Sequence, residues 1–485
     1  MKILKYIPIL CIVAFTSCDL NLLPISEIEE TVYYNNTAEI NSAVVACYNG
    51  LQQPMEFEWM LTELRTDNSR LYNTATTSSD NTLLFDFDQA KVSSTNARVY
   101  DYWTASYRNI ARCNTVINPV HIAVVADETL KNQYEGEAKF IRAYHYFNLV
   151  RLFGPVFIVT ENISAQQART FDRSPVEEVY ELIQSDLNSA IEKLPVSYSD
   201  AEKGRITSWA AKALLAKVYM TQGRVDIETR DLLKDIYDNS GYRLMDTYAS
   251  VFDINNEVND EILFTVRYKS GGLGLGSMFG NSFAPQLSGL SVINGDGSGF
   301  NYPSSDLIGV YTSADTRKDV TLALSYTNTQ NTIVDRRYVK KYLSPVTVKN
   351  DGDKDWPIIR FADVILMYAE LENELNGVEA ALPLINETRH RAGLFDLNDV
   401  SVPNKHTMRM EIEKERRLEF AYENHRWFDL VRTGRAIDVI NAHYVKEDYY
   451  LTLTGVGPLN SSTLLMPIPQ KEIDINQNIS QNVGY

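Results

Sequence analysis

The segment Glu413–Arg435, EKERRLEFAYENHRWFDLVRTGR, alternates acids, arginines and aromatic residues and has almost no small side chains. On a helix, residues three apart are neighbours, so opposite charges at that spacing can form ion pairs. Four pairs have this spacing: Arg416–Glu419, Glu423–Arg426, Arg426–Asp429 and Asp429–Arg432.

This charge pairing argues against a catalytic or phosphate-binding role for the segment. A carboxylate beside an arginine is held ionised, with a lowered pKa. A glycosidase acid needs the opposite, a raised pKa in an apolar pocket. Arginines that are balanced by acids are also poor phosphate ligands. The pattern therefore predicts a charge-paired pair of scaffold helices buttressed by aromatic side chains.

The chain on either side of this segment is predicted to be mainly α-helical, because apolar residues recur at helical spacing. Alanine-rich stretches that must pack closely, and glycines at helix ends, favour antiparallel helix pairs stacked like tetratricopeptide repeats. The predicted helical stretches are 100–117, 134–154, 174–195 and 206–223, then 357–377, 379–394 and 408–434.

The middle of the chain has a different character. EILFTVRY (261–268) and RRYVKKYL (336–343) are strand-like, and glycine- and serine-rich loops lie between them. Two of these loops are long: SGGLGLGSMFGNS (270–282) and NGDGSGFNYPSS (294–305). Long irregular loops in a compact protein are usually functional or mobile.

The domain organisation follows from these stretches. A chain of 485 residues is long enough for two cores or one large composite core. We expect an N-terminal helical region over residues 18–225 and a C-terminal region over 260–485, which is loop-rich over 260–350 and helical over 357–440.

The composition makes nucleic acid an unlikely partner class. The formal net charge is −17 at pH 7, and so acidic a surface repels phosphate backbones. The 29 tyrosines are many for this length. Tyrosine combines a flat apolar face with a hydroxyl at its edge, which suits sugar rings and wet interfaces, although most tyrosines would simply pack helices together.

Residues 1–17 are predicted to be a lipoprotein signal peptide. Lys2 and Lys5 precede an apolar run that is too short to span a bilayer as a helix. The small residues before Cys18 resemble a lipobox, in which cleavage leaves the cysteine to carry lipid, including palmitate. Such lipidation would hold the mature chain at a membrane. The alternative is an ordinary signal peptide followed by a coincidental cysteine.

Seven blocks along the chain resemble the SusD/RagB family of outer-membrane lipoproteins over essentially its full length. Their order behind a lipobox makes the resemblance specific. The blocks are YWTASYRNIARCN (102–114), EAKFIRAYHYFNLVRLFGPV (137–156), GRITSWAAKALLAKVY (204–219), IIRFADVILMYAE (358–370), INETRHRAGL (385–394), ERRLEFAYENHRWFDLVR (415–432) and LLMPIPQKEIDINQNISQNVGY (464–485).

The resemblance implies a mainly α, SusD-like fold with four tetratricopeptide-like helical hairpins in an α–α superhelix, plus a loop-rich region with short strands. In similar sequences a glycine commonly follows the position of Glu423, where this chain has Asn424. Asparagine tolerates the left-handed backbone conformation better than most residues, so a helix break is expected there.

The resemblance also implies a function. Such proteins are non-enzymatic, lipid-anchored at the cell outer membrane and surface-exposed, and they capture nutrients for a SusC-like TonB-dependent transporter. The ligand is expected to be an oligosaccharide, and no cofactor is implied. A peptide-binding member of the family is the first alternative. A lipoprotein glycosidase, which would need two carboxylates about 5–10 Å apart in one cleft, and a pure interaction scaffold are further alternatives.

For ligand binding the resemblance points to the segment before the 100–117 helix and to the loop-rich middle. Sugars stack their C–H faces on aromatic rings, and amide, carboxylate and guanidinium groups bind their hydroxyls. Because these family positions vary with the substrate, the candidates rest on residue type. They are Trp59, Asp67, Asn68, Arg70, Tyr72, Phe85 and Phe87 in the first region, and Phe300, Asn301, Tyr302 and Tyr311 in the second.

Two other motifs favour less specific interpretations. The glycines at 271–276 follow a strand-like run, but no helix follows them as a nucleotide loop requires, so a flexible loop is predicted. Asp351, Asp353 and Asp355 alternate like calcium ligands, but Trp356 stands where a calcium loop requires glycine. Calcium is therefore the less favoured alternative for this segment.

No catalytic or zinc-binding pattern is present in the sequence. No histidine pair falls at i,i+4 and no GxSxG nucleophile motif occurs. Cys47 and Cys113 are predicted to be buried free thiols, with a single disulfide between them as the alternative.

Overall fold

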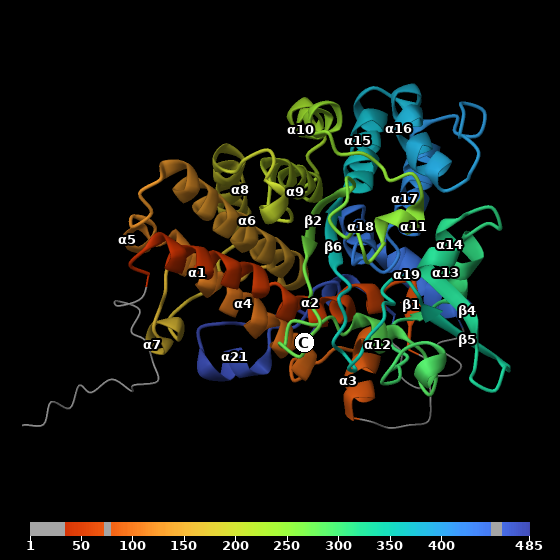
Figure 1. Cartoon of the computed structure of the whole chain (residues 1–485), viewed down its shortest axis with the longest axis horizontal. Helices are drawn as coiled ribbons and strands as arrows, with labels where there is room; N and C mark the ends of the chain where they lie inside the picture. Colours follow the sequence, from red (N-terminus) through yellow and green to blue (C-terminus); the bar gives the residue numbers. More distant parts are fainter. Residues whose placement is uncertain (1–33, 72–78, 448–457) are drawn as a thin grey trace, which may run out of the picture.

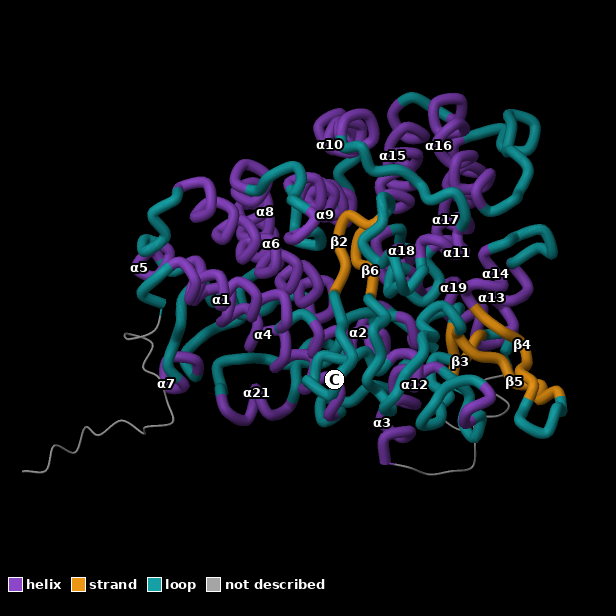
Figure 2. The backbone as a smooth tube through the Cα atoms, viewed as in Figure 1, coloured by secondary structure: helices purple, strands orange, loops and turns teal. Residues whose placement is uncertain are grey.

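The computed structural model describes residues 34–71, 79–447 and 458–485, which are drawn in colour in Figure 1. Its described part is mainly α-helical with three two-stranded sheets, which confirms the predicted fold class (Figure 2). The predicted signal peptide (1–17) and the predicted lipidation site, Cys18, lie outside the described residues.

A row of helices arches from the left of Figure 1 over the top to the right. Each helix packs on the next in chain order, and the third from the end also packs on the last. The row therefore has the stacked-hairpin arrangement that the sequence predicts. Its members are α4 (Ala97–Ile117), α6 (Glu128–Phe153), α8 (Val176–Lys193), α9 (Ser208–Thr221), α10 (Ile227–Asn239), α15 (Phe361–Leu375), α16 (Val378–Arg391) and α17 (Lys405–Glu419).

Shorter elements cover the flanks of this row. α1 (Thr37–Asn49) packs on α4 and α6, and α2 (Gln52–Leu61) packs on α4. The other helices are η1 (Glu63–Arg65), α3 (Ser79–Asp88), α5 (Pro119–Ile122), α7 (Ala165–Ala168), η2 (Asp200–Glu202), α11 (Tyr248–Val251), α12 (Phe279–Phe283), η3 (Gly289–Ser291), α13 (Ser305–Val310), α14 (Arg317–Thr321), α18 (Arg426–Arg432), α19 (Ala436–Lys446), η4 (Ser461–Thr463) and α21 (Gln470–Ile475).

Local sequence explains where several of these helices begin and how closely they pack. Asn96, Asp127 and Asn404 precede α4, α6 and α17, and the side chain of each accepts a backbone N–H of the first turn. α9 packs closely on its neighbours because its alanines are small, and four of them are at most 1% exposed: Ala210, Ala211, Ala213 and Ala216.

The three sheets each join segments that are distant or loop-separated in sequence. β1 (Ser69–Arg70) pairs antiparallel with β3 (Tyr302–Pro303), β2 (Ile262–Val266) with β6 (Trp356–Arg360), and β4 (Leu322–Thr327) with β5 (Ile333–Val339). β2 and part of β5 fall within the strand-like runs predicted at 261–268 and 336–343.

The helix predicted to begin at residue 357 begins instead at Phe361. The residues before it form β6, which runs through the centre of the molecule beside β2 (Figure 2). β-Branched Ile358 and Ile359 favour a strand, and pairing with β2 satisfies this segment's backbone. The predicted helical region 357–440 also contains a non-helical stretch between α16 and α17.

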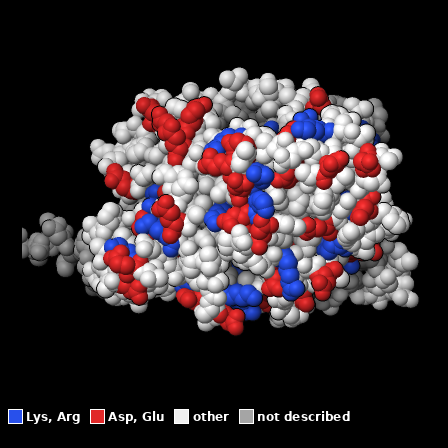
Figure 3. Space-filling view, turned by 90° about the horizontal axis from the view of Figure 1, so that it is seen from above, with Lys and Arg blue, Asp and Glu red and all other residues white. Residues whose placement is uncertain are grey.

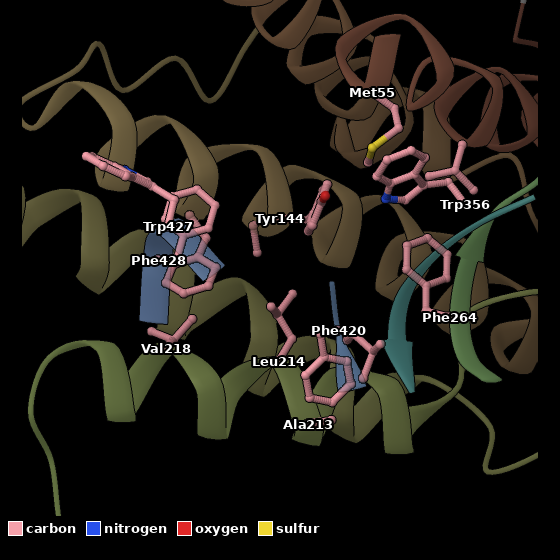
Figure 4. Close-up of a cluster of buried hydrophobic side chains, with 14 of the residues drawn as sticks. Met55, Tyr144, Ala213, Leu214, Val218, Phe264, Trp356, Phe420, Trp427 and Phe428 are labelled. Atoms are coloured by element: carbon pink, nitrogen blue, oxygen red, sulfur yellow. The ribbon is translucent and has the colours of Figure 1, made fainter. Parts of the chain in front are cut away.

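Aromatic side chains fill the interior between the helical row and the β2–β6 sheet (Figure 4). Trp356 of β6 stacks on Tyr342 with ring centroids 4.3 Å apart and an interplanar angle of 6°. Phe264 of β2 meets Phe140 of α6 edge to face at 5.1 Å. The sheet is therefore fixed to the N-terminal helices by ring packing.

A network of buried charges connects β2, β6 and the end of α17. The guanidinium of Arg360 lies 2.5 Å from Glu261, 2.9 Å from Glu419 and 2.8 Å from Glu423. Lys341 contacts Glu423 at 2.8 Å. All five side chains are at most 1% exposed, so each charge depends on its partners rather than on water.

The pKa of Glu419 shows how strongly these cations act. Burial alone would raise its pKa, but the Arg391, Arg360 and Arg317 guanidiniums hold it well below its usual value. The scaffold interpretation of Glu413–Arg435, which rests on ionised, arginine-paired carboxylates, is thus confirmed for this residue.

The expected helix break at Asn424 is present, with φ at +65°. Tyr422 also takes a left-handed conformation, with φ at +66°. α17 therefore ends at Glu419 and α18 begins at Arg426. Because residues on opposite sides of the break no longer share a helix, the predicted Glu423–Arg426 pair cannot keep its helical spacing.

Most of the predicted local ion pairs are replaced by tertiary ones. Asp429–Arg432 forms, at 3.0 Å. Arg416, in contrast, contacts Asp363 of α15 and Asp429, both at 2.9 Å. Arg426 contacts residue Asp67 near the N-terminus, at 2.8 Å. The prediction of i,i+3 pairing was wrong in these cases because buried partners from other elements take the charges.

We expect Arg360→Leu to lower the free energy of unfolding by about 3–5 kcal/mol, because it leaves three buried carboxylates without their shared cation. Urea titration followed by tryptophan fluorescence measures this change. Arg243→Gln is the control, since Arg243 is 71% exposed in its ion pair with Asp260 and should change stability by about 0–1 kcal/mol. A similarly small change for Arg360→Leu would contradict the role given to the network.

Candidate functional site

The two regions nominated from sequence for ligand binding lie side by side in the structure. Ser69 pairs with Pro303 and Arg70 with Tyr302 in the β1–β3 ladder. Next to the ladder, the Ser304 backbone N–H donates to the Asn68 carbonyl at 3.0 Å. Residues more than 230 positions apart are thereby joined.

A pocket with about 400 Å³ of empty space, part of it open to solvent, lies where these regions meet. The pocket brings together three of the nominated aromatic residues: Phe85 of α3, Phe300 of the loop before β3, and Tyr302 of β3. The remaining lining residues are Leu71, Pro285, Gln286, Ser298, Gly299, Arg336 and Arg337. The lining thus combines aromatic faces with amide, hydroxyl and guanidinium groups.

Trp59 supports this pocket from behind and does not line it. Its ring stacks on Phe300 with centroids 6.1 Å apart and an interplanar angle of 25°. It also meets Phe283 of α12 edge to face at 5.3 Å. Trp59 is 1% exposed, so it was nominated as a contact but lies in the core, where it fixes the orientation of Phe300.

Asp67 and Asn68, also nominated, are buried and hold the scaffold together. Arg426 and Arg417 contact the Asp67 carboxylate at 2.8 and 3.1 Å. Burial alone would raise the pKa of Asp67, but these two guanidiniums hold it well below its usual value. Asn68 accepts a hydrogen bond from Arg417 and donates one to Glu63. Neither side chain faces the pocket.

The other nominated residues that the structure describes also lie away from the pocket lining. Phe87 and Asn301 are fully buried, and the Tyr311 hydroxyl donates to the Leu418 carbonyl inside the protein. Arg70 is partly exposed and pairs with Glu447 at 3.0 Å. Tyr72 lies outside the described residues.

Sequence reasoning missed the arginines of this pocket. RRYVKKYL was identified as a strand, but the adjacent Arg336 and Arg337 were not connected with the aromatic candidates. Arg337 donates to the Ser305 hydroxyl at 2.8 Å, and its guanidinium carbon lies 5.8 Å from the centroid of the Tyr302 ring. The two consecutive arginines in RRYVKKYL were visible in the sequence, but their proximity to the aromatic residues depends on tertiary structure.

The glycine-rich loop and the alternating aspartates hold each other in place. Asp351 accepts the backbone N–H groups of Gly271 and Gly272, both at 2.9 Å. Asp353 accepts from the Ser270 backbone and hydroxyl, and Asp355 accepts from the Tyr268 backbone at 2.8 Å. In an extended segment alternate side chains share one face, so the three aspartates all face residues 268–272, which follow β2.

No cluster of three or more metal-ligating side chains occurs among the described residues. Cys47 and Cys113 are both buried and unbonded, as the sequence predicts by default, and burial raises the pKa of Cys113. Within the described ranges, no helix combines the length and apolarity needed to cross a membrane.

The molecular surface is mixed in charge on the face that is visible from above. Figure 3 shows acidic and basic side chains interspersed over this face, with more of it red than blue. No broad basic patch is visible on this face.

A second cavity, with about 670 Å³ of empty space including open solvent, is lined mainly by residues of α6, α9, β6 and α18, with Glu58 of α2. Glu58 lines it, accepts a hydrogen bond from Asn148 at 3.1 Å and has its pKa raised to about 7 by burial. The carboxylates of Glu423 and Asp429 line the same cavity but are ion-paired with arginines.

Two family models match the chain, one in its N-terminal part and one in its C-terminal part. The model described as "SusD family" matches residues 296–485. The model described as "Starch-binding associating with outer membrane" matches residues 20–220.

Relatives and solved structures agree with these matches. SusD-like protein P25 of Formosa agariphila is 27% identical over 510 residues, covering 95% of each chain. A SusD-like protein of Bacteroides ovatus is 30% identical over 371 residues, covering 68% of this chain and 64% of the relative. A solved laminarin-binding SusD-like protein superposes with a TM-score of 0.79 at 26% identity, covering 93% of this chain and all of the other.

We expect Glu58→Gln to stabilise the protein increasingly as the pH rises. The pKa of Glu58 is raised from 4.5 to about 7 in the fold, so its contribution to stability is fully present below pH ~4.5 and is lost as the pH rises through ~7. The melting temperature of the variant relative to the parent should therefore increase by a few degrees between pH 5 and pH 8.

Glu192→Gln, on the exposed side of α8, is the control for removal of a surface charge. A melting-temperature difference for Glu58→Gln that stays constant from pH 5 to pH 8 would contradict this account of the buried carboxyl.

Proposed function

The chain belongs to the SusD family, and on that premise we propose that it captures an oligosaccharide in the pocket beside β1, β3 and β5. The observation that carries the proposal is the convergence of Phe85, Phe300 and Tyr302 on one pocket. Pyranose rings present C–H faces that pack on such aromatic rings. The Gln286 amide and the Ser298 hydroxyl offer hydrogen bonds for sugar hydroxyls.

The packing behind the pocket supports a binding role. Phe300 rests on Trp59, which Phe283 holds in turn. A ring that is fixed before the ligand arrives loses little conformational freedom on binding. The surrounding loop can then vary without moving the aromatic surface.

Carbohydrate is supported as the ligand class by the relatives. One solved relative is named for laminarin binding, and one of the matching family models is described as starch-binding. We transfer only the ligand class and not the particular glycan, because the names of the relatives do not specify which residues line this pocket. A peptide ligand is the alternative within the same fold.

We propose that the chain acts without catalysis. Glu58, one of several carboxyls whose pKa is raised by burial, lies in the second cavity beside carboxylates that arginines hold. A glycosidase acid needs an accessible partner carboxylate that can act as base or nucleophile. Among the described residues, the aromatic pocket has no acidic lining residue at all.

We further propose that Cys18 carries a lipid anchor at the outer membrane and that a SusC-like TonB-dependent transporter receives the captured ligand. The phrase "associating with outer membrane" in the matching family description supports this location. Anchoring next to a transporter raises the effective concentration of ligand at its entrance, so even a weak site is sufficient.

We expect Phe300→Ala to weaken oligosaccharide binding at least about tenfold, equivalent to about 1.4 kcal/mol, because it removes the supported ring of the pocket. Calorimetric titration of the full-length chain in nonionic detergent, with laminari-, other plant and microbial oligosaccharides and with mixed peptides, measures this. Saturable binding of one glycan class supports the proposal. Binding of peptides alone would replace the ligand class.

Two variants control for indirect effects of that change. Phe300→Tyr keeps the ring and should retain most of the affinity. Phe395→Ala removes a ring that is 92% exposed in the loop after α16 and should leave binding unchanged. If Phe300→Ala bound as tightly as the parent, the pocket would not be the site.

We expect Cys18→Ser to release the chain from the membrane fraction and to abolish incorporation of labelled palmitate, because no other residue is proposed to carry lipid. Fractionation and metabolic labelling of cells that express each form give the readout. Absence of label from the parent chain would instead indicate an ordinary signal peptide and a coincidental cysteine.

A further inference from the structure

Asn301 forms a sharp corner of the chain between two of the pocket's aromatic residues. Its φ is +55°, in the left-handed region that asparagine adopts more readily than most residues. Phe300 comes before this corner and Tyr302 after it, and both line the pocket. The backbone conformation of Asn301 therefore affects how the two rings are placed relative to each other.

The chain is hydrogen-bonded to a different part of the structure on each side of this corner. Before it, the backbone N–H groups of residues 298–300 donate to carbonyls of α12 and of Ala284, which follows α12, at 2.8 to 2.9 Å. After it, Tyr302 and Pro303 pair with β1. The Phe300 ring thus belongs to a segment that α12 holds, whereas the Tyr302 ring belongs to the β1–β3 sheet.

The Asn301 side chain ties the corner to β1. It is fully buried and does not line the pocket, although its residue type made it a candidate ligand contact. The Ser69 hydroxyl of β1 donates to the Asn301 Oδ1 atom at 2.5 Å. Among the described residues the Asn301 Nδ2 atom has no partner, so the contact with Ser69 is the one hydrogen bond that this amide makes.

We propose that Asn301 is a positioning residue of the pocket, one that the ligand does not touch. Its left-handed backbone sets the turn of the chain. Its hydrogen bond with Ser69 fixes that turn against β1, so that Phe300 and Tyr302 both contact one bound oligosaccharide. Because the two rings are held in place before the ligand arrives, little conformational freedom is lost on binding. This inference rests on the proposed capture of oligosaccharides and adds the residue that sets the geometry of the aromatic surface.

Two substitutions of Asn301 separate the role of its backbone from that of its side chain. Asn301→Ala disfavours the left-handed conformation and removes the amide, so we expect oligosaccharide binding to weaken about tenfold. Asn301→Gly removes the amide but adopts positive φ freely, so it should regain part of the affinity and bind about threefold more weakly than the parent. Calorimetric titration of the full-length chain in nonionic detergent, with hexasaccharides of the laminari, xylo and galacto series as probes, measures these affinities.

A double-mutant cycle tests the hydrogen bond itself. Ser69→Ala removes the donor and should weaken binding about threefold, as Asn301→Gly does. Because the two side chains share one hydrogen bond, the double variant should lose no more affinity than either single variant. Losses that multiply to about ninefold would show that the two residues act independently, and would overturn the role given to this contact.

Asn331→Ala is the control for a left-handed asparagine outside the pocket. Asn331 is exposed in the turn between β4 and β5, with φ at +59°, so its substitution should lower the melting temperature and leave the affinity unchanged. Parent-like affinity of Asn301→Ala would overturn the positioning role and leave glycan capture intact. No saturable binding of any hexasaccharide by the parent would overturn both. Far-UV circular dichroism shows which variants are folded, and Asn301→Gly and Ser69→Ala, which introduce no strained backbone, carry the test if Asn301→Ala does not fold.

Discussion

Ion pairs without access to water hold the centre of this protein. Arg360 joins carboxylates from the start of β2 and from the end of α17 and the turn after it. Removing two charges from water is costly, so such a pair is retained only where its geometry is good and its remaining donors and acceptors are satisfied. Here the Arg360 guanidinium also donates to the Glu419 backbone carbonyl at 3.0 Å. Arg360 therefore holds the β2–β6 sheet against the C-terminal end of α17.

The same network reaches the candidate pocket through α17 and α18. Arg417 and Arg426 lock the carboxylate of Asp67, and Asp67 lies two residues before β1. β1 in turn pairs with β3, which supplies Tyr302 to the pocket. The arginine-rich segment that the sequence predicts to be scaffold therefore supports the pocket from behind. Loops determine which groups the pocket presents, and the buried ion pairs determine where it lies.

The sequence predicts the parts of this structure that depend on local pattern. Helical periodicity identifies α4, α6, α8 and α9, and the tolerance of asparagine for left-handed backbone predicts the break at Asn424. Prediction from sequence fails where a distant segment supplies the partner that a local residue was expected to supply. Arg416 has Glu419 at helical spacing but contacts Asp363 of α15 instead. The β1–β3 pairing is non-local as well. Aromatic candidates could therefore be nominated from residue type, but the two pocket arginines could not be connected with them.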